Sequence, residues 1–183
     1  MSDDSWQADV TKMTRILQIV VGALVAGTLF FLVIALTIGP QGVPSAAPLP
    51  ISLTLIAALF TGMMLIARAV CIWQVTARGR RQIAGGTYRP VSPQQWSGAA
   101  GKPVGDAQSL FMVFQTRTIA SAAMFEGCAF FATICYLIEG GPISLALAVC
   151  LILGVAAHFP TPARVIGWIE RQLETLEEER RPR

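Results

Sequence analysis

Residues 16–38 read ILQIVVGALVAGTLFFLVIALTI, a run of 23 residues without a charged side chain. A helix needs about 20 apolar residues to cross the roughly 30 Å hydrocarbon core of a bilayer. Backbone groups cannot be left unbonded in lipid, so each such run is expected to be helical. The chain contains three more apolar runs of similar character: Ile51 to about Val75, about Thr118 to Ile138, and Ile143 to Phe159. We therefore predict an all-α membrane protein with four transmembrane helices.

The composition excludes several other classes of protein. Of the 183 residues, 54% are hydrophobic and 14% are charged, whereas a soluble domain carries about 25% charged residues. The four cysteines lie in or beside apolar runs, which is typical of packed free thiols. With one histidine and no zinc-type spacing, neither a metal nor a cofactor is expected. No nucleophile–base pair or pair of carboxylates lies near the membrane boundary, so we do not expect an enzyme.

The basic residues predict the orientation. Thirteen of the fourteen lie in the N-terminal tail, the middle loop or the C-terminal tail, or at their membrane edges, and the fourteenth is Arg68. By the positive-inside rule, both termini and the middle loop are expected to be cytoplasmic. Because orientation accounts for these charges, no nucleic-acid partner is expected. Arg78, Arg80 and Arg81 follow the second run and either set the orientation only or also hold anionic lipid headgroups.

The order of these segments predicts four parts. A first hairpin with its N-terminal tail occupies residues 1–75, a cytoplasmic loop rich in Gly, Pro and Arg occupies 76–105, a second hairpin occupies 106–160, and a cytoplasmic amphipathic helix with a charged tail occupies 161–183. The two hairpins resemble each other, because residues 50–62 and 142–154 are identical at seven of thirteen aligned positions. A duplication would relate the hairpins by an axis along the membrane normal.

Local signals place two helix starts outside the spans. Asp106 is expected to begin the third helix, before the membrane is reached. Thr161-Pro162 is typical of a helix N-terminus, and the apolar residues that follow it recur at helical spacing. This amphipathic helix is expected either to pack under the bundle or to pair with a second copy. Small residues four apart, such as Ala23/Gly27, Ala58/Gly62, Ala123/Gly127 and Cys150/Gly154, favour close helix contacts.

Two charges interrupt the spans, Arg68 in the second and Glu126 in the third. Counted from Arg117 at about 1.5 Å per residue, Glu126 lies roughly 13 Å into the membrane. A carboxylate at that depth is costly and is a functional candidate by default. Three interpretations stay open: a structural pair with Arg68, a protonatable group in an ion or ligand pathway, or a group that faces another subunit.

Two resemblances concern the second half of the chain. Residues 122–130, AAMFEGCAF, resemble the carboxylate-bearing helix of rotary ATPase proteolipids, although this chain lacks their alternating glycines and carries its carboxylate on the first helix of a hairpin. The Glu126-Gly127-Cys128-Ala129 core and the segment 159–173 are similar to those of small four-span bacterial membrane proteins of uncharacterised activity. That resemblance implies the inner membrane of a bacterium and no particular activity.

The leading hypothesis is a multi-pass structural or assembly component whose partners are the lipid bilayer and either a second copy or another membrane protein. The rival hypothesis is a proton- or cation-coupled pathway centred on Glu126.

Overall fold

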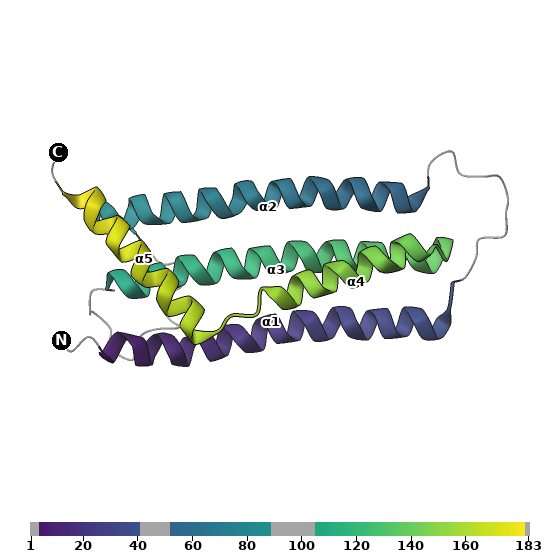
Figure 1. The fold of residues 1–183 in the computed structure, drawn as a ribbon, viewed down its shortest axis with the longest axis horizontal. Helices are drawn as coiled ribbons and strands as arrows, with labels where there is room; N and C mark the ends of the chain where they lie inside the picture. Colours follow the sequence, from purple (N-terminus) through teal and green to yellow (C-terminus); the bar gives the residue numbers. More distant parts are fainter. Residues whose placement is uncertain (1–3, 41–51, 89–104, 182–183) are drawn as a thin grey trace. The chain divides into compact units, whose positions relative to one another are not determined.

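The computed structural model describes residues 4–40, 52–88 and 105–181, and within these ranges the chain forms helices and short connections. The helices are α1 (Asp4–Ile38), α2 (Leu53–Ala84), α3 (Asp106–Glu139), α4 (Pro142–Ala157) and α5 (Pro162–Arg180) (Figure 1). Helices α1, α2 and α3 are each long and apolar enough to cross a membrane, and α4 with α5 forms a bent pair that makes a fourth candidate if it is one span. The all-α prediction is confirmed.

Helix α2 extends well beyond the apolar run that predicted it. It continues to Ala84, so residues 76–84 of the expected loop are helical, because arginine, glutamine and alanine favour helix. It ends in a Schellman motif at Gly85-Gly86: the Thr87 N–H donates to the Gln82 carbonyl (2.9 Å), and Gly86 has a φ of 67°. Glycine adopts this left-handed conformation without steric cost, which fixes where the helix stops. The rest of the expected loop, 89–104, lies outside the described residues.

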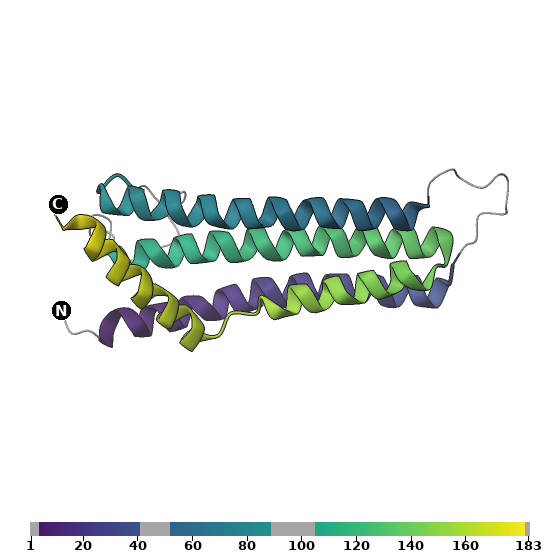
Figure 2. The ribbon, with the colours of Figure 1, turned by 45° about the horizontal axis from the view of Figure 1, so that its top comes forward.

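The chain divides into two compact units, which are considered separately. The first, here called the span unit, contains Ile19–Cys71 and Thr118–Phe159. In it, α3 contacts each of the other helices, as the neighbouring ribbons in Figures 1 and 2 illustrate. Phe130 packs on Phe31 of α1 with ring centres 5.0 Å apart, and Phe131 packs on Phe60 of α2 at 5.4 Å. Buried small residues bring α3 close to α4, with a core of Leu32, Cys128, Ala129, Ala132, Ala148, Leu151 and Ile152.

The second unit, here called the terminal unit, contains Met1–Gln18, Ile72–Arg117 and Pro160–Arg183. Its core includes apolar residues from the ends of three long helices and from α5: Val10, Leu17, Ile83, Leu110, Phe111, Val165, Ile169 and Leu176. Helix α5 begins as the sequence predicts, with Thr161 accepting a hydrogen bond from the Arg164 N–H (3.4 Å) and proline in the first turn. Trp168 of α5 is buried against Phe114 of α3, with ring centres 5.3 Å apart.

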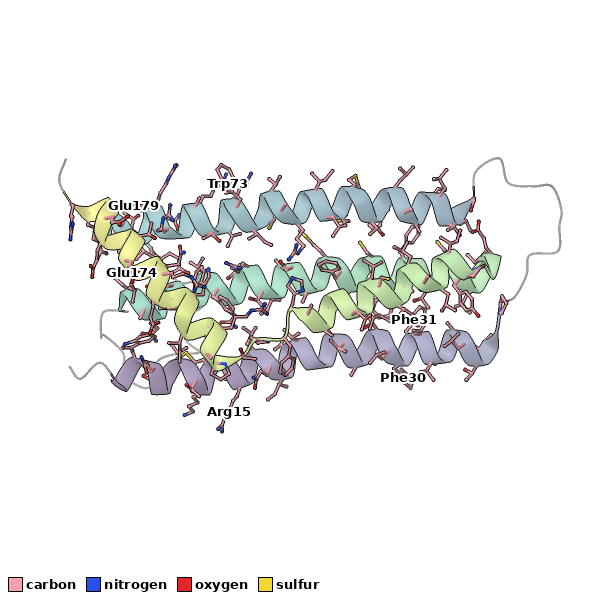
Figure 3. All side chains as sticks on the ribbon, in the orientation of Figure 1. Arg15, Phe30, Phe31, Trp73, Glu174 and Glu179 are labelled. Atoms are coloured by element: carbon pink, nitrogen blue, oxygen red, sulfur yellow. The ribbon has the colours of Figure 1, made fainter. Side chains whose placement is uncertain are left out.

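Large apolar side chains remain exposed on α1 and α2. Phe30 is 69% exposed and points away from the other helices of its unit, whereas its neighbour Phe31 points toward them (Figure 3). In the terminal unit, Trp73 of α2 is 71% exposed and also points outward. Exposed apolar surface of this extent is unfavourable in water. Together with the candidate spans, it indicates contact with a lipid bilayer.

Candidate functional site

Arg68 of α2 contacts two other helical elements of the span unit. Its Nη2 lies 2.6 Å from Nε2 of His158, the residue that follows α4. Its guanidinium carbon lies 5.1 Å from the centre of the Phe125 ring on α3. Phe125 and His158 also contact each other, with ring centres 5.2 Å apart. The cation is therefore stabilised by a hydrogen bond and by the electron-rich face of an aromatic ring.

The short length of α4 explains why an acceptor is available at this position. Its 16 residues span about 24 Å at 1.5 Å per residue, less than the roughly 30 Å hydrocarbon core. A helix C-terminus carries partial negative charge and unpaired carbonyl groups, which favour a nearby cation. His158 connects Arg68 to this end of α4: its Nε2 contacts Arg68, and its Nδ1 is 2.6 Å from the Gly154 carbonyl oxygen. His158 was not predicted as a site residue; the signal that the sequence offers is its place at the end of an apolar run, directly before Phe159-Pro160.

A small cavity lies beside Arg68 and is mainly apolar. Its volume is about 10 Å³, and its lining includes Thr61, Met64, Phe125 and Cys128, which leaves room for about one water molecule. The Thr61 hydroxyl is buried and makes no hydrogen bond of ordinary geometry in the described structure; its polar neighbour is the Cys128 thiol, a weak partner. The cavity is too small to hold an organic ligand as it stands.

The structure does not bring Arg68 and Glu126 together. In the part of the chain that the structure describes, the ion pairs join Arg80 to Glu179 and Arg180 to Asp106, and none joins Arg68 to Glu126. The geometry of α3 gives the reason: Phe125 faces Arg68, and the next residue on a helix is turned by about 100°. The functional roles of the two charges stay predictions.

Glu126 lies where α3 meets α1. Phe130 of α3 packs on Phe31 of α1, and the two helices run in the same direction (Figure 1). Glu126 and Gly27 each lie one helical turn before these phenylalanines, so they are at the same height along the two helix axes. The Glu126 side chain is half-buried. None of the other described residues makes a hydrogen bond or an ion pair with its carboxylate. Glu126 thus presents a polar group at the seam between two apolar helices.

Small residues on both helices leave the surface beside Glu126 open. Ala23 and Gly27 of α1 are exposed, as are Ala123 and Gly127 of α3. A methyl group added at Gly27 or Gly127 would meet no atom of another element within 4 Å. We refer to Ala23, Gly27, Ala123, Glu126 and Gly127 as the Glu126 seam. By contrast, Gly154 is closely packed, since a methyl group there would lie 2.8 Å from the Phe125 ring.

Two buried threonine hydroxyls of the span unit, those of Thr28 and Thr133, bond within their own helices. Thr28 donates to the Leu24 and Val25 carbonyls, both at 3.0 Å, and Thr133 donates to the Ala129 carbonyl at 2.8 Å. These bonds satisfy the hydroxyls locally. Neither of these two hydroxyls donates a hydrogen bond to Glu126.

Glu139 at the opposite end of α3 binds the N-terminus of α2. Its carboxylate accepts hydrogen bonds from the backbone N–H groups of Leu53 and Thr54, the latter at 3.0 Å, and from the Ser52 hydroxyl at 3.2 Å. An anion at a helix N-terminus satisfies unpaired N–H groups and interacts favourably with the helix dipole. This cap was not predicted from the sequence, because Glu139 and Leu53 are 86 positions apart and no local pattern joins them.

The basic residues that follow the second span have different environments in the terminal unit. Arg80 forms an ion pair with Glu179 of α5 at 2.8 Å, whereas Arg78 and Arg81 are exposed. Glu179, the partner of Arg80, is labelled near the C-terminal end of α5 in Figure 3. Arg80 therefore binds another helix of the same protein. The prediction that basic residues here bind lipid headgroups now concerns mainly Arg78 and Arg81.

Arg180 joins three helices of the terminal unit. It donates to both carboxylate oxygens of Asp106 at 2.7 and 3.2 Å and to the Ile83 carbonyl at 3.1 Å. It thus connects α5 to the start of α3 and to the end of α2. The hydrogen bonds to Asp106 raise the pKa of Arg180 above its ordinary value, so the guanidinium stays protonated throughout the physiological pH range.

Comparisons with protein-family models, with curated proteins and with solved structures found no match.

Proposed function

We propose that the chain is a non-enzymatic assembly component of a bacterial inner membrane, with four spans in two hairpins, both termini in the cytoplasm, and a surface at the Glu126 seam that binds a helix of another membrane-embedded chain. The half-exposed, unpartnered Glu126 carboxylate beside open glycines carries the proposal. A carboxylate at this depth is costly unless it is paired. A neighbouring helix with a hydrogen-bond donor would supply that pairing, and the small residues would allow close approach.

The division of the chain supports the proposed topology. The chain passes from the terminal unit into the span unit after Gln18 and Arg117, and from the span unit into the terminal unit after Cys71 and Phe159. These positions lie within a few residues of the cytoplasmic ends of the four spans that the apolar runs predict. The terminal unit contains most of the basic residues, as expected for the cytoplasmic side.

The proposal is tested by measuring assembly size in native membranes solubilised in mild detergent, by native mass spectrometry. Glu126→Leu and Gly127→Leu should weaken association, by about 3- to 30-fold if the interhelical contact contributes about 0.6–2 kcal/mol. Gly62→Leu is the matched control, because Gly62 is also an exposed helical glycine with open space around it. Helicity measured by circular dichroism should be unchanged in all three variants.

The rival function is examined with the same proteins in liposomes. If Glu126 conducts protons or cations, Glu126→Gln abolishes flux while the assembly stays intact. A wild-type protein that is monomeric in native membranes, or an equal loss of association in Gly62→Leu and Gly127→Leu, would overturn the assembly proposal.

A further inference from the structure

The contacts of His158 determine its protonation state. Its Nε2 lies 2.6 Å from Nη2 of Arg68, and its Nδ1 lies 2.6 Å from the carbonyl oxygen of Gly154. A guanidinium group only donates hydrogen bonds, and a carbonyl oxygen only accepts them. The ring must therefore accept at Nε2 and carry its hydrogen on Nδ1, which is one tautomer of the neutral imidazole.

A second proton on this ring is incompatible with the contact. Protonated histidine has a hydrogen on both nitrogens and can no longer accept a bond from Arg68. It also places a positive charge beside the guanidinium, in surroundings where charges are weakly screened. One protonation therefore replaces an attractive contact with a repulsive one.

The groups of the span unit that could change this balance can be named. Helix α2 presents Arg68 to His158, and α3 presents the Phe125 ring. Helix α3 also carries Cys128, at the cavity that Arg68 lines, and Glu126, which is turned toward α1. The α1 segment from Ile19 to Ile38 has no titratable residue. On α4 itself, Cys150 lies two turns before His158 and is exposed. Among these groups, Arg68 brings its charge into direct contact with the ring.

We propose that the Arg68–His158 contact is a proton-sensitive latch, which holds the C-terminal turn of α4 against α2 when His158 is neutral and releases that turn when His158 is protonated. The ring is half-buried and lies one residue from the end of the span unit, so it is accessible to protons. After release, the turn would keep its packing of Gly154 on Phe125 but lose its polar attachment to α2.

The latch is directly observable because His158 is the single histidine in the 183-residue chain. Full-length protein with ¹⁵N-labelled histidine and a histidine-free affinity tag would be placed in lipid bilayers and studied by solid-state NMR between about pH 8 and pH 5. At neutral pH the two nitrogens should report a protonated Nδ1 and an unprotonated Nε2. In acid both should be protonated, with loss of the through-space signal between His158 and Arg68. A hydrogen on Nε2 at neutral pH, or an Arg68 contact that survives protonation, would overturn the proposal.

A second measurement follows the movement of α4. Spin labels at the exposed positions Ala69 of α2 and Ala156 of α4 would report their separation by double electron–electron resonance. The short-distance population should be lost in acid in the wild-type protein. His158→Gln is the matched control, because glutamine offers an acceptor for Arg68 but is not protonated, and its distances should stay constant. A wild-type distance that does not change with pH, or a change that persists in His158→Gln, would contradict the latch.

Discussion

Arg68 lies in a helix that is long and apolar enough to cross a membrane, and it has a hydrogen-bond acceptor in His158 at the end of α4. Removal of one member of a buried polar pair leaves the other uncompensated, whereas removal of both can be neutral. Removal of His158 alone should therefore cost more than the net free energy of its hydrogen bond to Arg68. The additional cost arises because the guanidinium group is left at the end of α4 without an acceptor. The contact is therefore expected to be more important as a constraint on α4 than as a net source of stability.

This asymmetry gives a prediction for His158. His158→Ala should lower the free energy of unfolding by about 2–3 kcal/mol, since a charged hydrogen bond is lost and Arg68 is left unpaired. The double variant Arg68→Leu/His158→Leu should lose much less. Unfolding in mixed micelles, followed by circular dichroism, measures both. A double variant that is as unstable as His158→Ala would show that the apolar packing around the pair, not its charge, decides the stability.

Substitution of Glu139 tests whether its carboxylate caps the N-terminus of α2. Its carboxylate binds the first N–H groups of α2, and loss of such a cap costs about 1 kcal/mol. Glu139→Ala should therefore increase hydrogen exchange at Leu53 and Thr54 and leave exchange in the middle of α2 unchanged. Glu178→Ala, which removes an exposed carboxylate from α5, is the control. Equal protection at Leu53 in wild type and Glu139→Ala would contradict the role of the cap.

At the scale of the helices, two glycines at equivalent positions of the two hairpins differ in how closely they are packed. The alignment of residues 50–62 with 142–154 pairs Gly62 with Gly154. Gly62 faces open space, whereas Gly154 receives the Phe125 ring. The duplication stays a prediction. What the structure adds is that only one of these two glycines is required for packing within the chain.

This difference predicts opposite outcomes for one substitution. Gly154→Ala should destabilise the protein by about 1–3 kcal/mol, because the added methyl group overlaps the Phe125 ring and the core must shift. Gly62→Ala should be neutral or stabilising, since alanine favours helix and meets nothing. Thermal unfolding of the two purified variants distinguishes them, and a similar loss in both would contradict the difference in packing between Gly62 and Gly154.

The helices were predictable from the sequence to different degrees. Long apolar runs gave the three long candidate spans, and Asp106 and Thr161-Pro162 gave two helix starts, because these signals are local. The end of α2 at Gly85-Gly86 was missed, since the prediction used the end of the apolar run and not the later glycine pair. The Arg68–His158 contact was missed for another reason: it depends on which faces of three helices meet, and helix rotation about its axis is set by packing.

At the scale of the whole molecule, the sorting of basic residues predicts the orientation. Reporter fusions that are active only in the cytoplasm should be active after Arg183 and within the middle loop at Pro93, and inactive at Ser45. Residues 45 and 93 lie outside the described structure, so this measurement is independent of it. Activity at Ser45 together with inactivity at Pro93 would reverse the proposed topology.

The assembly proposal depends on whether another protein covers the Glu126 seam. The most direct measurement is photo-crosslinking in intact membranes, with a photoreactive amino acid at Ala123 and, as the matched control, at Ala58, an exposed alanine of α2. The account predicts a covalent protein–protein adduct from Ala123 that is lost in Glu126→Leu, and only lipid adducts from Ala58. Lipid adducts alone at both positions would contradict it.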